Sequence, residues 1–160
     1  MIKINNLSKK YIRSLRLNDI KKILNHNPES LRFFDNDIRN NKKIILDIVK
    51  KNGYCLRFAS RNLRNNKEIV YEAIKNFGFA IKFASKVFKD NERFGFLALK
   101  TSGYVLNHLS QNLKKNKKIV EFAVRKNGYA IQYADKSIFK DKKFIIKILS
   151  FYLGGTSFAY

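Results

Sequence analysis

The segment Lys51-Asn-Gly-Tyr-Cys-Leu-Arg-Phe-Ala-Ser60 decides the fold, because close copies of it follow at residues 76–85, 101–110 and 126–135. Each copy has a glycine in its third position, so Gly53, Gly78, Gly103 and Gly128 stand 25 residues apart. A fixed period of about 20 to 50 residues is typical of supersecondary elements stacked one on the next, and not of one globular core. In such proteins function usually belongs to a surface built from several repeats.

The period extends beyond the four glycines. Apolar pairs keep the same register from about Asp19 to Tyr160, and the outer two repeats lack the glycine, as the capping repeats of a stack often do. We therefore expect a single domain over residues 1–160, with an N-terminal cap at residues 1–18. The predicted repeats are residues 19–41, 42–66, 67–91, 92–116, 117–141 and 142–160.

Each repeat is expected to contain two short helices. Apolar residues in 67–76 recur with helical spacing, and Asn66 stands before them as an N-cap. Gly78 follows at the position where helices commonly end in a left-handed conformation, and a second helix would run from Phe79 to about Lys86. The other expected N-caps are Asn41, Asn91, Asn116 and Asp141. No strand-like alternation competes, so the sequence predicts an all-α helical-repeat solenoid of about six two-helix repeats.

The charge of the chain needs an explanation. The formal net charge is +22, from 34 basic and 12 acidic residues. One explanation is a polyanionic partner such as nucleic acid, an anionic membrane surface or an acidic protein. The other is compositional bias, because the chain is rich in Lys, Asn, Ile, Phe and Tyr, which an AT-rich genome over-supplies. Both explanations stay open at this point.

The charge can be assigned to columns of the repeat, which gives two candidate phosphate-binding surfaces. The first lies in the first turn of the first helix of each repeat, where cations oppose the helix dipole. Its residues are Lys42, Lys43, Lys67, Arg93, Lys117, Lys118, Lys142 and Lys143. The alternative surface flanks the loop between repeats, and its residues are Arg57, Arg61, Arg64, Lys86, Lys89 and Lys114. A solvated lysine face also explains these columns without any ligand.

Two aromatic columns accompany the repeat. The first is Tyr54, Phe79, Tyr104 and Tyr129, and the second is Phe33, Phe58, Phe83, Tyr133 and Phe158. Base stacking is one use of such rings, but their spacing from apolar neighbours favours core packing, above all in the second column.

The C-terminal residues 148–160 are uncharged and rich in aromatic side chains. They either fold back as a cap or support self-association, which would give a homo-oligomer. The candidate self-association residues are Phe151, Tyr152, Phe158 and Tyr160.

The sequence contains no catalytic constellation. His26 and His108 are isolated, and no HExxH, CxxC or GxGxxG pattern occurs, so we expect neither an enzyme nor a metal or other cofactor. Cys55 is the only cysteine, which excludes an intrachain disulfide and fits a reducing compartment inside a cell. We expect no secretory signal and no transmembrane segment, because no long uncharged apolar stretch occurs.

The repeat motif resembles a known family. Residues 118–134 read Lys-Ile-Val…Ala-Val-Arg-Lys-Asn-Gly-Tyr-Ala-Ile-Gln-Tyr-Ala and are similar to the family catalogued as domain of unknown function 4116. The resemblance covers about Asp19 to Tyr160 and implies tandem helical repeats found largely in giant DNA viruses, protists and some intracellular bacteria. It implies no activity and supplies no catalytic residues. This chain is more basic than common members, so binding to an acidic partner is expected from composition alone.

These observations give a primary hypothesis and an alternative. The primary hypothesis is a non-enzymatic protein that binds the phosphate backbone of DNA or RNA without sequence specificity, in a viral particle or a ribonucleoprotein. The alternative is a protein–protein interaction scaffold that binds an acidic partner or assembles with itself. Basic columns that converge on one face would favour the first.

Overall fold

The computed structural model describes residue 12 and residues 14–152 of the chain, and this part is built from helices without any strand. The prediction of an all-α helical repeat is therefore confirmed. Contacts divide the chain into two compact parts, Met1–Ala84 and Ser85–Tyr160, which we name the N-terminal unit and the C-terminal unit. The expectation of one continuous domain stays a prediction.

The N-terminal unit contains α-helices and 3-10 helices, and the 3-10 helices carry the label η. Its elements are α2 (Leu17–His26), η2 (Pro28–Phe33), α3 (Asn36–Arg39), α4 (Lys42–Lys51), η3 (Gly53–Phe58), η4 (Leu63–Asn65), α5 (Lys67–Asn76) and η5 (Gly78–Phe83). Helix α4 packs against α5, and η3 packs against both η2 and η5. The unit therefore has a layer of the longer α-helices α2, α4 and α5 and a layer of the 3-10 helices η2, η3 and η5, and the two layers contact each other.

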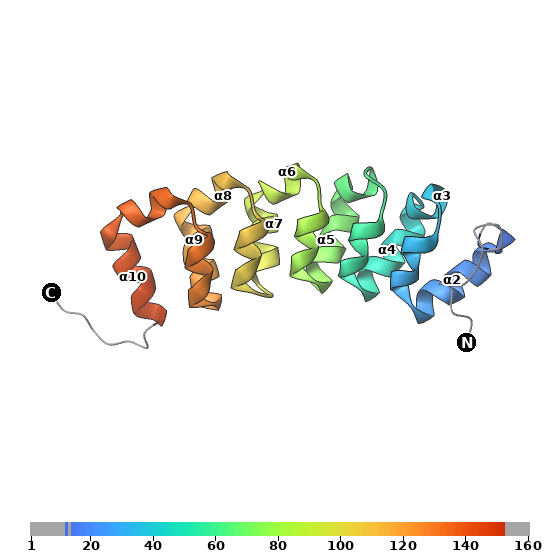
Figure 1. Ribbon diagram of the computed structural model, residues 1–160, viewed down its shortest axis with the longest axis horizontal. Coiled ribbons are helices and arrows are strands. Elements are labelled where there is room, and N and C mark those ends of the chain that lie inside the picture. Colours follow the sequence, from blue (N-terminus) through green and yellow to red (C-terminus); the bar gives the residue numbers. More distant parts are fainter. Residues whose placement is uncertain (1–11, 13, 153–160) are drawn as a thin grey trace. The chain divides into compact units, whose positions relative to one another are not determined.

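The C-terminal unit repeats this arrangement. Its elements are α6 (Lys86–Lys89), α7 (Glu92–Leu99), η6 (Gly103–His108), α8 (Gln111–Lys115), α9 (Lys117–Lys126), η7 (Gly128–Tyr133), η8 (Lys136–Lys140) and α10 (Lys142–Tyr152). Helix α9 packs between α7 and α10, and η6 packs on η7 (Figure 1). The short helices α6 and α8 lie at one end of the longer α-helices (Figure 1).

In every repeat whose second helix the structure describes, that helix is a 3-10 helix, so the predicted second helix from Phe79 to Lys86 is wrong. Helix η5 ends at Phe83, Ala84 is extended with φ −68° and ψ 161°, and α6 begins only at Lys86. Gly78, Ile81 and Ala84 are all buried, and their spacing of three residues matches the three residues per turn of a 3-10 helix. A repeat therefore contains three short helical elements instead of two.

The repeated glycine does not end a helix in a left-handed conformation, contrary to the prediction. Helix α5 ends at Asn76, and its C-cap Phe77 is extended with φ −144°. Gly78 is already the first residue of η5. Some other property of glycine must explain why it recurs.

That property is the missing side chain, which lets successive repeats approach closely. A Cβ atom on Gly53 would lie 2.2 Å from the carbonyl oxygen of Ala73, and one on Gly103 would lie 2.3 Å from that of Ala123. The Gly53 amide also donates a hydrogen bond of 2.8 Å to Asn76 Oδ1. The glycine therefore fixes how near the start of a 3-10 helix lies to the α-helix of the next repeat.

The predicted N-caps are confirmed. The side-chain oxygen of Asn66 accepts a hydrogen bond of 3.2 Å from the amide of Ile69, three residues later. Equivalent bonds are made by Asn41, Asn91, Asn116 and Asp141. Each cap satisfies an amide that the first helical turn leaves without a partner.

Apolar pairs on the inner faces of the α-helices form the core. Fully buried examples are Ile45, Val49, Ile69, Val70, Ala73 and Ile74 in the N-terminal unit, and Ala98, Leu99, Ile119, Val120, Ala123 and Ile148 in the C-terminal unit. Cys55 is also fully buried, and this burial, together with the charge of Glu29, raises the pKa of its thiol from 9.0 to about 12. The thiol is therefore protonated and unreactive at neutral pH.

Candidate nucleic-acid interface

Basic residues of the loops and of the first helical turns lie at the same end of the longer α-helices. Helix η4 ends at Asn65 and α5 begins at Lys67, while α8 ends at Lys115 and α9 begins at Lys117. Because one residue separates η4 from α5 and α8 from α9, each short helix and the first turn of the following α-helix must be neighbours. Apart from Arg57, the two surfaces that the sequence treats as alternatives are thus one surface within each unit, which we name its loop end.

The loop end of the C-terminal unit carries an excess of positive charge. Its cations are Lys86, Lys89, Arg93, Lys114, Lys115, Lys117, Lys118, Lys136, Lys140, Lys142 and Lys143, and its acids are Asp90, Glu92, Asp135 and Asp141. In the N-terminal unit the cations are Arg39, Lys42, Lys43, Arg61, Arg64 and Lys67, and the acids are Asp35, Asp37 and Glu68. Sequence reasoning missed Lys115 and Lys140, because their column also contains Asn40, Asn65 and Asp90.

Three of these lysines line a shallow hollow at the loop end of the C-terminal unit. The hollow has a volume of about 490 Å³ and is lined by Lys115, Lys117 and Lys118 together with Glu92, Asn112 and Asn116. It includes the N-terminus of α9, where the helix dipole adds partial positive charge. Lysine ammonium groups around a helix N-terminus form an environment that favours phosphate oxygens.

Part of the charge is balanced by ion pairs between consecutive repeats. Lys42 lies 2.8 Å from Glu68, and Lys117 lies 2.5 Å from Asp141. Hydrogen bonds from these lysines lower the pKa of Glu68 and of Asp141. Such solvent-exposed pairs contribute little to stability. The described part of the chain shows no ion pair for Lys43, Lys118, Lys142 or Lys143, all of which are exposed.

Three of the predicted phosphate contacts in the loops are half-buried, and their column has a structural role. These three are Arg64, Lys89 and Lys114, and Arg39 occupies the same column. Arg39 Nε donates a hydrogen bond of 2.6 Å to the carbonyl oxygen of Phe58, while Arg64 Nε is buried without a hydrogen-bond partner. The carbonyl oxygens of Arg39, Lys89 and Lys114 accept hydrogen bonds from the amides of Ser60, Ser110 and Asp135 in the next repeat.

A cluster of aromatic rings surrounds Arg57 in the 3-10 layer of the N-terminal unit. The guanidinium carbon lies 5.1 Å from the ring centroid of Tyr54, 5.0 Å from that of Phe58 and 5.9 Å from that of Phe83. Arg57 Nη1 also donates a hydrogen bond to the Tyr54 hydroxyl. The Tyr54 ring meets Phe58, Phe77 and Phe83 edge-on, with centroid separations of 6.3, 6.3 and 5.5 Å. We name these five residues the Arg57 cluster.

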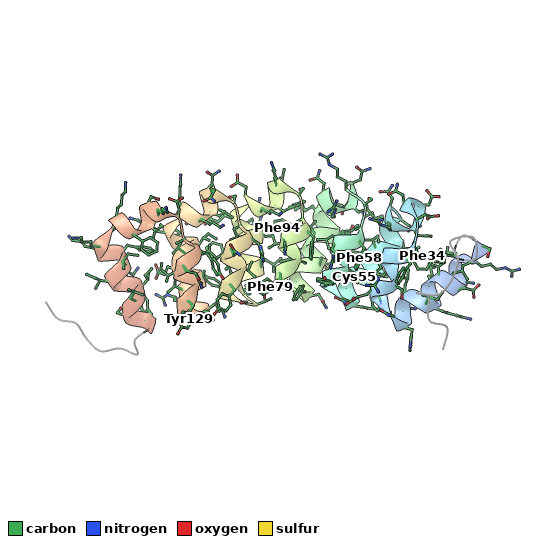
Figure 2. All side chains as sticks on the ribbon, viewed as in Figure 1. Phe34, Cys55, Phe58, Phe79, Phe94 and Tyr129 are labelled. Atoms are coloured by element: carbon green, nitrogen blue, oxygen red, sulfur yellow. The ribbon has the colours of Figure 1, made fainter. Side chains whose placement is uncertain are left out.

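The rings of this cluster keep part of their surface in solvent, so the expectation of core packing for the second aromatic column is only partly right. Phe58 and Phe83 are half-buried, and 37% of Phe77 is exposed. Cys55 and Phe58 both belong to η3 (Figure 2), yet Cys55 is fully buried while Phe58 reaches the surface. Phe158, in the same column, lies outside the described residues.

Helices η6 and η7 form the equivalent 3-10 layer of the C-terminal unit, and they are aromatic but carry no lysine or arginine. Positions equivalent to Arg57 are occupied by Asn107 in η6 and Gln132 in η7. Tyr104 and Tyr133 meet edge-on at 6.1 Å, and Tyr129 is 64% exposed. The two units therefore present different chemistry on equivalent surfaces.

Of the candidate self-association residues, Phe151 is described together with its surroundings. Its ring is 47% exposed and lies 3.8 Å from the Arg125 guanidinium carbon. Arg125 in turn pairs with Glu121 at 2.8 Å, and Lys147 pairs with the same carboxylate at 3.2 Å. Phe151 is thus partly covered by its own unit. The Tyr152 side chain, Phe158 and Tyr160 lie outside the described residues.

Within residues 12 and 14–152, no group of three or more histidine, cysteine, aspartate or glutamate side chains is arranged to hold a metal ion. In the same part of the chain, no helix has the length and apolar character needed to cross a membrane.

A family described as Domain of unknown function (DUF4116) has a model that matches the chain repeatedly. The matches cover residues 18–64, 41–89, 66–114, 96–140 and 116–158. Each one spans nearly two of the 25-residue repeats, and together they cover most of the chain. Comparisons with the curated proteins and with the solved structures found no match.

Proposed function

The chain belongs to the DUF4116 family of helical repeats, and we propose that it binds nucleic acid through the phosphate backbone without sequence specificity. The observation that carries the proposal is the loop end of the C-terminal unit, where the exposed Lys115 at the end of α8 and the exposed Lys117 and Lys118 at the start of α9 line one hollow. We infer no catalytic role. Nucleic acid is available as a ligand inside a viral particle, in a ribonucleoprotein and in the reducing interior of a cell.

The position of these lysines supports a ligand more strongly than their number does. Cations in the first turn oppose the helix dipole, at about 0.3–1 kcal/mol each, so helix stability alone would favour Asp or Glu there. Lys117, Lys118, Lys142 and Lys143 nevertheless occupy the first turns of α9 and α10. A phosphate group would reverse this penalty, because it interacts favourably with both the ammonium groups and the helix N-terminus.

The test is binding of random-sequence DNA and RNA across a salt series, measured by fluorescence anisotropy. We expect log affinity to fall linearly with log salt, with a slope near 0.9 per neutralised phosphate for duplex DNA, and with little dependence on sequence. Replacing Lys117, Lys118, Lys142 and Lys143 by Ala should reduce that slope.

A charge-matched control separates a defined surface from net charge alone. Lys50, Lys75, Lys100 and Lys126 are exposed cations at the opposite end of the longer helices, and their replacement by Ala removes the same charge. We expect this control to change the slope far less. Equal effects would overturn the assignment to the loop end, and no binding at low salt would overturn the function.

The alternative, a scaffold that binds an acidic protein or another copy of the chain, has one observation in its favour. A second hollow in the C-terminal unit, of about 510 Å³, is lined by apolar Val87 and Leu109 as well as by Lys86 and Lys89. Val87 is 68% exposed. Light scattering of the wild-type chain and of a Val87→Asp variant tests self-association. A monomer in both cases would remove that part of the alternative.

A further inference from the structure

The Arg57 cluster has a feature that binding to phosphates does not use. The phenylalanine rings lie edge-on to the Tyr54 ring, the Arg57 guanidinium group lies over the rings of Tyr54, Phe58 and Phe83, and both Arg57 and Phe77 are exposed. An arginine that only bound phosphate would need no aromatic surroundings, and rings that only filled the core would not be partly open to solvent. The combination of an exposed planar cation with partly exposed aromatic rings is instead what unstacked nucleobases bind.

We propose that the 3-10 layer of the N-terminal unit stacks the bases of a single-stranded nucleic acid on the Arg57 cluster. This inference rests on the proposed function and specifies its ligand: a single strand is preferred to a duplex. Bases within a duplex are already stacked on each other, and their faces cannot reach such a surface. A single strand offers every base face, whatever its sequence.

Neighbouring 3-10 helices extend the surface on both sides of the cluster. The Arg32 guanidinium carbon in η2 lies 4.6 Å from the Phe33 ring centroid, and η2 packs on η3. In η5, Lys82 stands beside Phe83, and η5 packs on η3 from the other direction. Helices η2, η3 and η5 therefore each pair a cation with an aromatic ring. Glu29 is the one acidic residue in these three helices, so the surface suits an anionic strand.

The C-terminal unit supplies an internal control, because its 3-10 layer has the aromatic rings without the cations. Tyr129 in η7 is more exposed than any ring of the Arg57 cluster, but Gln132 replaces the arginine. Aromatic exposure alone would predict stacking at Tyr129. The proposal predicts it at Phe77 instead.

The experiment uses the fact that the chain contains no tryptophan. A Phe77→Trp variant of the full chain places a single reporter in the cluster, and a Tyr129→Trp variant places one in the control surface. Each is titrated with an oligoadenylate single strand, with an abasic strand of the same length and charge, and with a duplex. We expect the oligoadenylate to quench the reporter at position 77 strongly, the abasic strand and the duplex weakly, and the reporter at 129 to respond little.

A second variant measures the stacking contribution without a reporter. Arg57→Lys retains the charge but removes the planar guanidinium group. We expect this variant to bind the oligoadenylate about fivefold or more weakly, which corresponds to the loss of one stacked base. Its affinity for the abasic strand should stay unchanged. A merely structural role of Arg57 would alter the affinity for both strands alike or for neither.

The outcomes separate this inference from the function on which it rests. If the single strand, the abasic strand and the duplex bind equally and Arg57→Lys has no selective effect, the inference is overturned while backbone binding stands. Equal quenching at positions 77 and 129 also overturns the placement of the site. If no strand binds at low salt, the proposed function itself fails.

Discussion

Gly53 and Gly103 show how a single missing methyl group sets the spacing of the repeat. The backbone of each glycine lies directly against a helical carbonyl oxygen of the next repeat, that of Ala73 or of Ala123. Neither glycine needs an unusual backbone dihedral angle, because each begins a 3-10 helix after an extended residue. The requirement is purely one of space, so any side chain would push two repeats apart.

Replacing either glycine by alanine should therefore strongly destabilise the unit that contains it. For Gly53→Ala and Gly103→Ala we expect the free energy of unfolding to fall by about 3 kcal/mol, because the backbone atoms that a Cβ would strike cannot rotate away. Urea unfolding followed by circular dichroism measures the loss. A loss below about 1 kcal/mol at both positions would contradict the proposed role of the glycine.

Gly95 provides the matched control for these substitutions. A Cβ atom there would meet the side-chain tip of Leu113 at 3.1 Å, which can move, and Gly95 lies within helix α7. Alanine is favoured over glycine inside a helix by about 0.5–1 kcal/mol. We therefore expect Gly95→Ala to change stability by no more than about 1 kcal/mol in either direction.

Among the elements, the sequence predicts the α-helices well and the 3-10 helices poorly. Asn66 and the apolar positions from Ile69 to Ile74 carry two independent helix signals, and α5 begins and ends where they indicate. The segment 78–86 also contains apolar residues three and four apart, so it reads as an α-helix. The decisive spacing of Gly78, Ile81 and Ala84 becomes meaningful only when the close contact between repeats is known, and local sequence does not supply that contact.

Glu121 of α9 also contacts α10, because its carboxylate pairs with Lys147 as well as with Arg125. A hydrogen bond from Arg125 lowers the pKa of Glu121, and a hydrogen bond from Lys147 lowers it further. A carboxyl group with a lowered pKa in the folded state contributes stability above its usual pKa of 4.5 and loses that contribution as the pH falls. The stability of this contact should therefore depend on pH in the acidic range.

We expect Glu121→Gln to lower the free energy of unfolding by about 0.5 kcal/mol at pH 7, the scale of a largely solvent-screened ion pair. The difference between wild type and variant should shrink as the pH falls through 4.5 and below, because both side chains are then neutral. Urea unfolding at several pH values measures it. A difference that stays constant down to acidic pH would show that Glu121 acts by packing and not by charge.

For the chain as a whole, the sequence predicts which cations of the candidate interface are exposed, but not which of them lie close together. The exposure of Lys43, Lys118 and Lys143 follows from helical periodicity, and the structure shows them exposed. The loop cations and the first-turn cations lie at the same end because the third helical element of each repeat ends shortly before the next α-helix begins. The sequence pattern does not show where that third element ends. The Arg57 cluster is also missed, because helical spacing alone cannot distinguish a half-open aromatic ring from a buried one.

The net charge of +22 leads to a prediction about stability that needs no ligand. The described residues contain four ion pairs, and each has at least one partner with half or more of its side chain exposed, so attraction offsets little of the repulsion among 34 cations. Raising sodium chloride from about 0.01 M to 0.15 M shortens the Debye length from about 30 Å to about 8 Å. Tm should therefore rise, by about 3 °C for each kcal/mol of repulsion relieved. Differential scanning fluorimetry measures this rise in Tm. A Tm that falls with salt would mean that attractive pairs dominate, and the cationic surface would then be balanced within the fold itself.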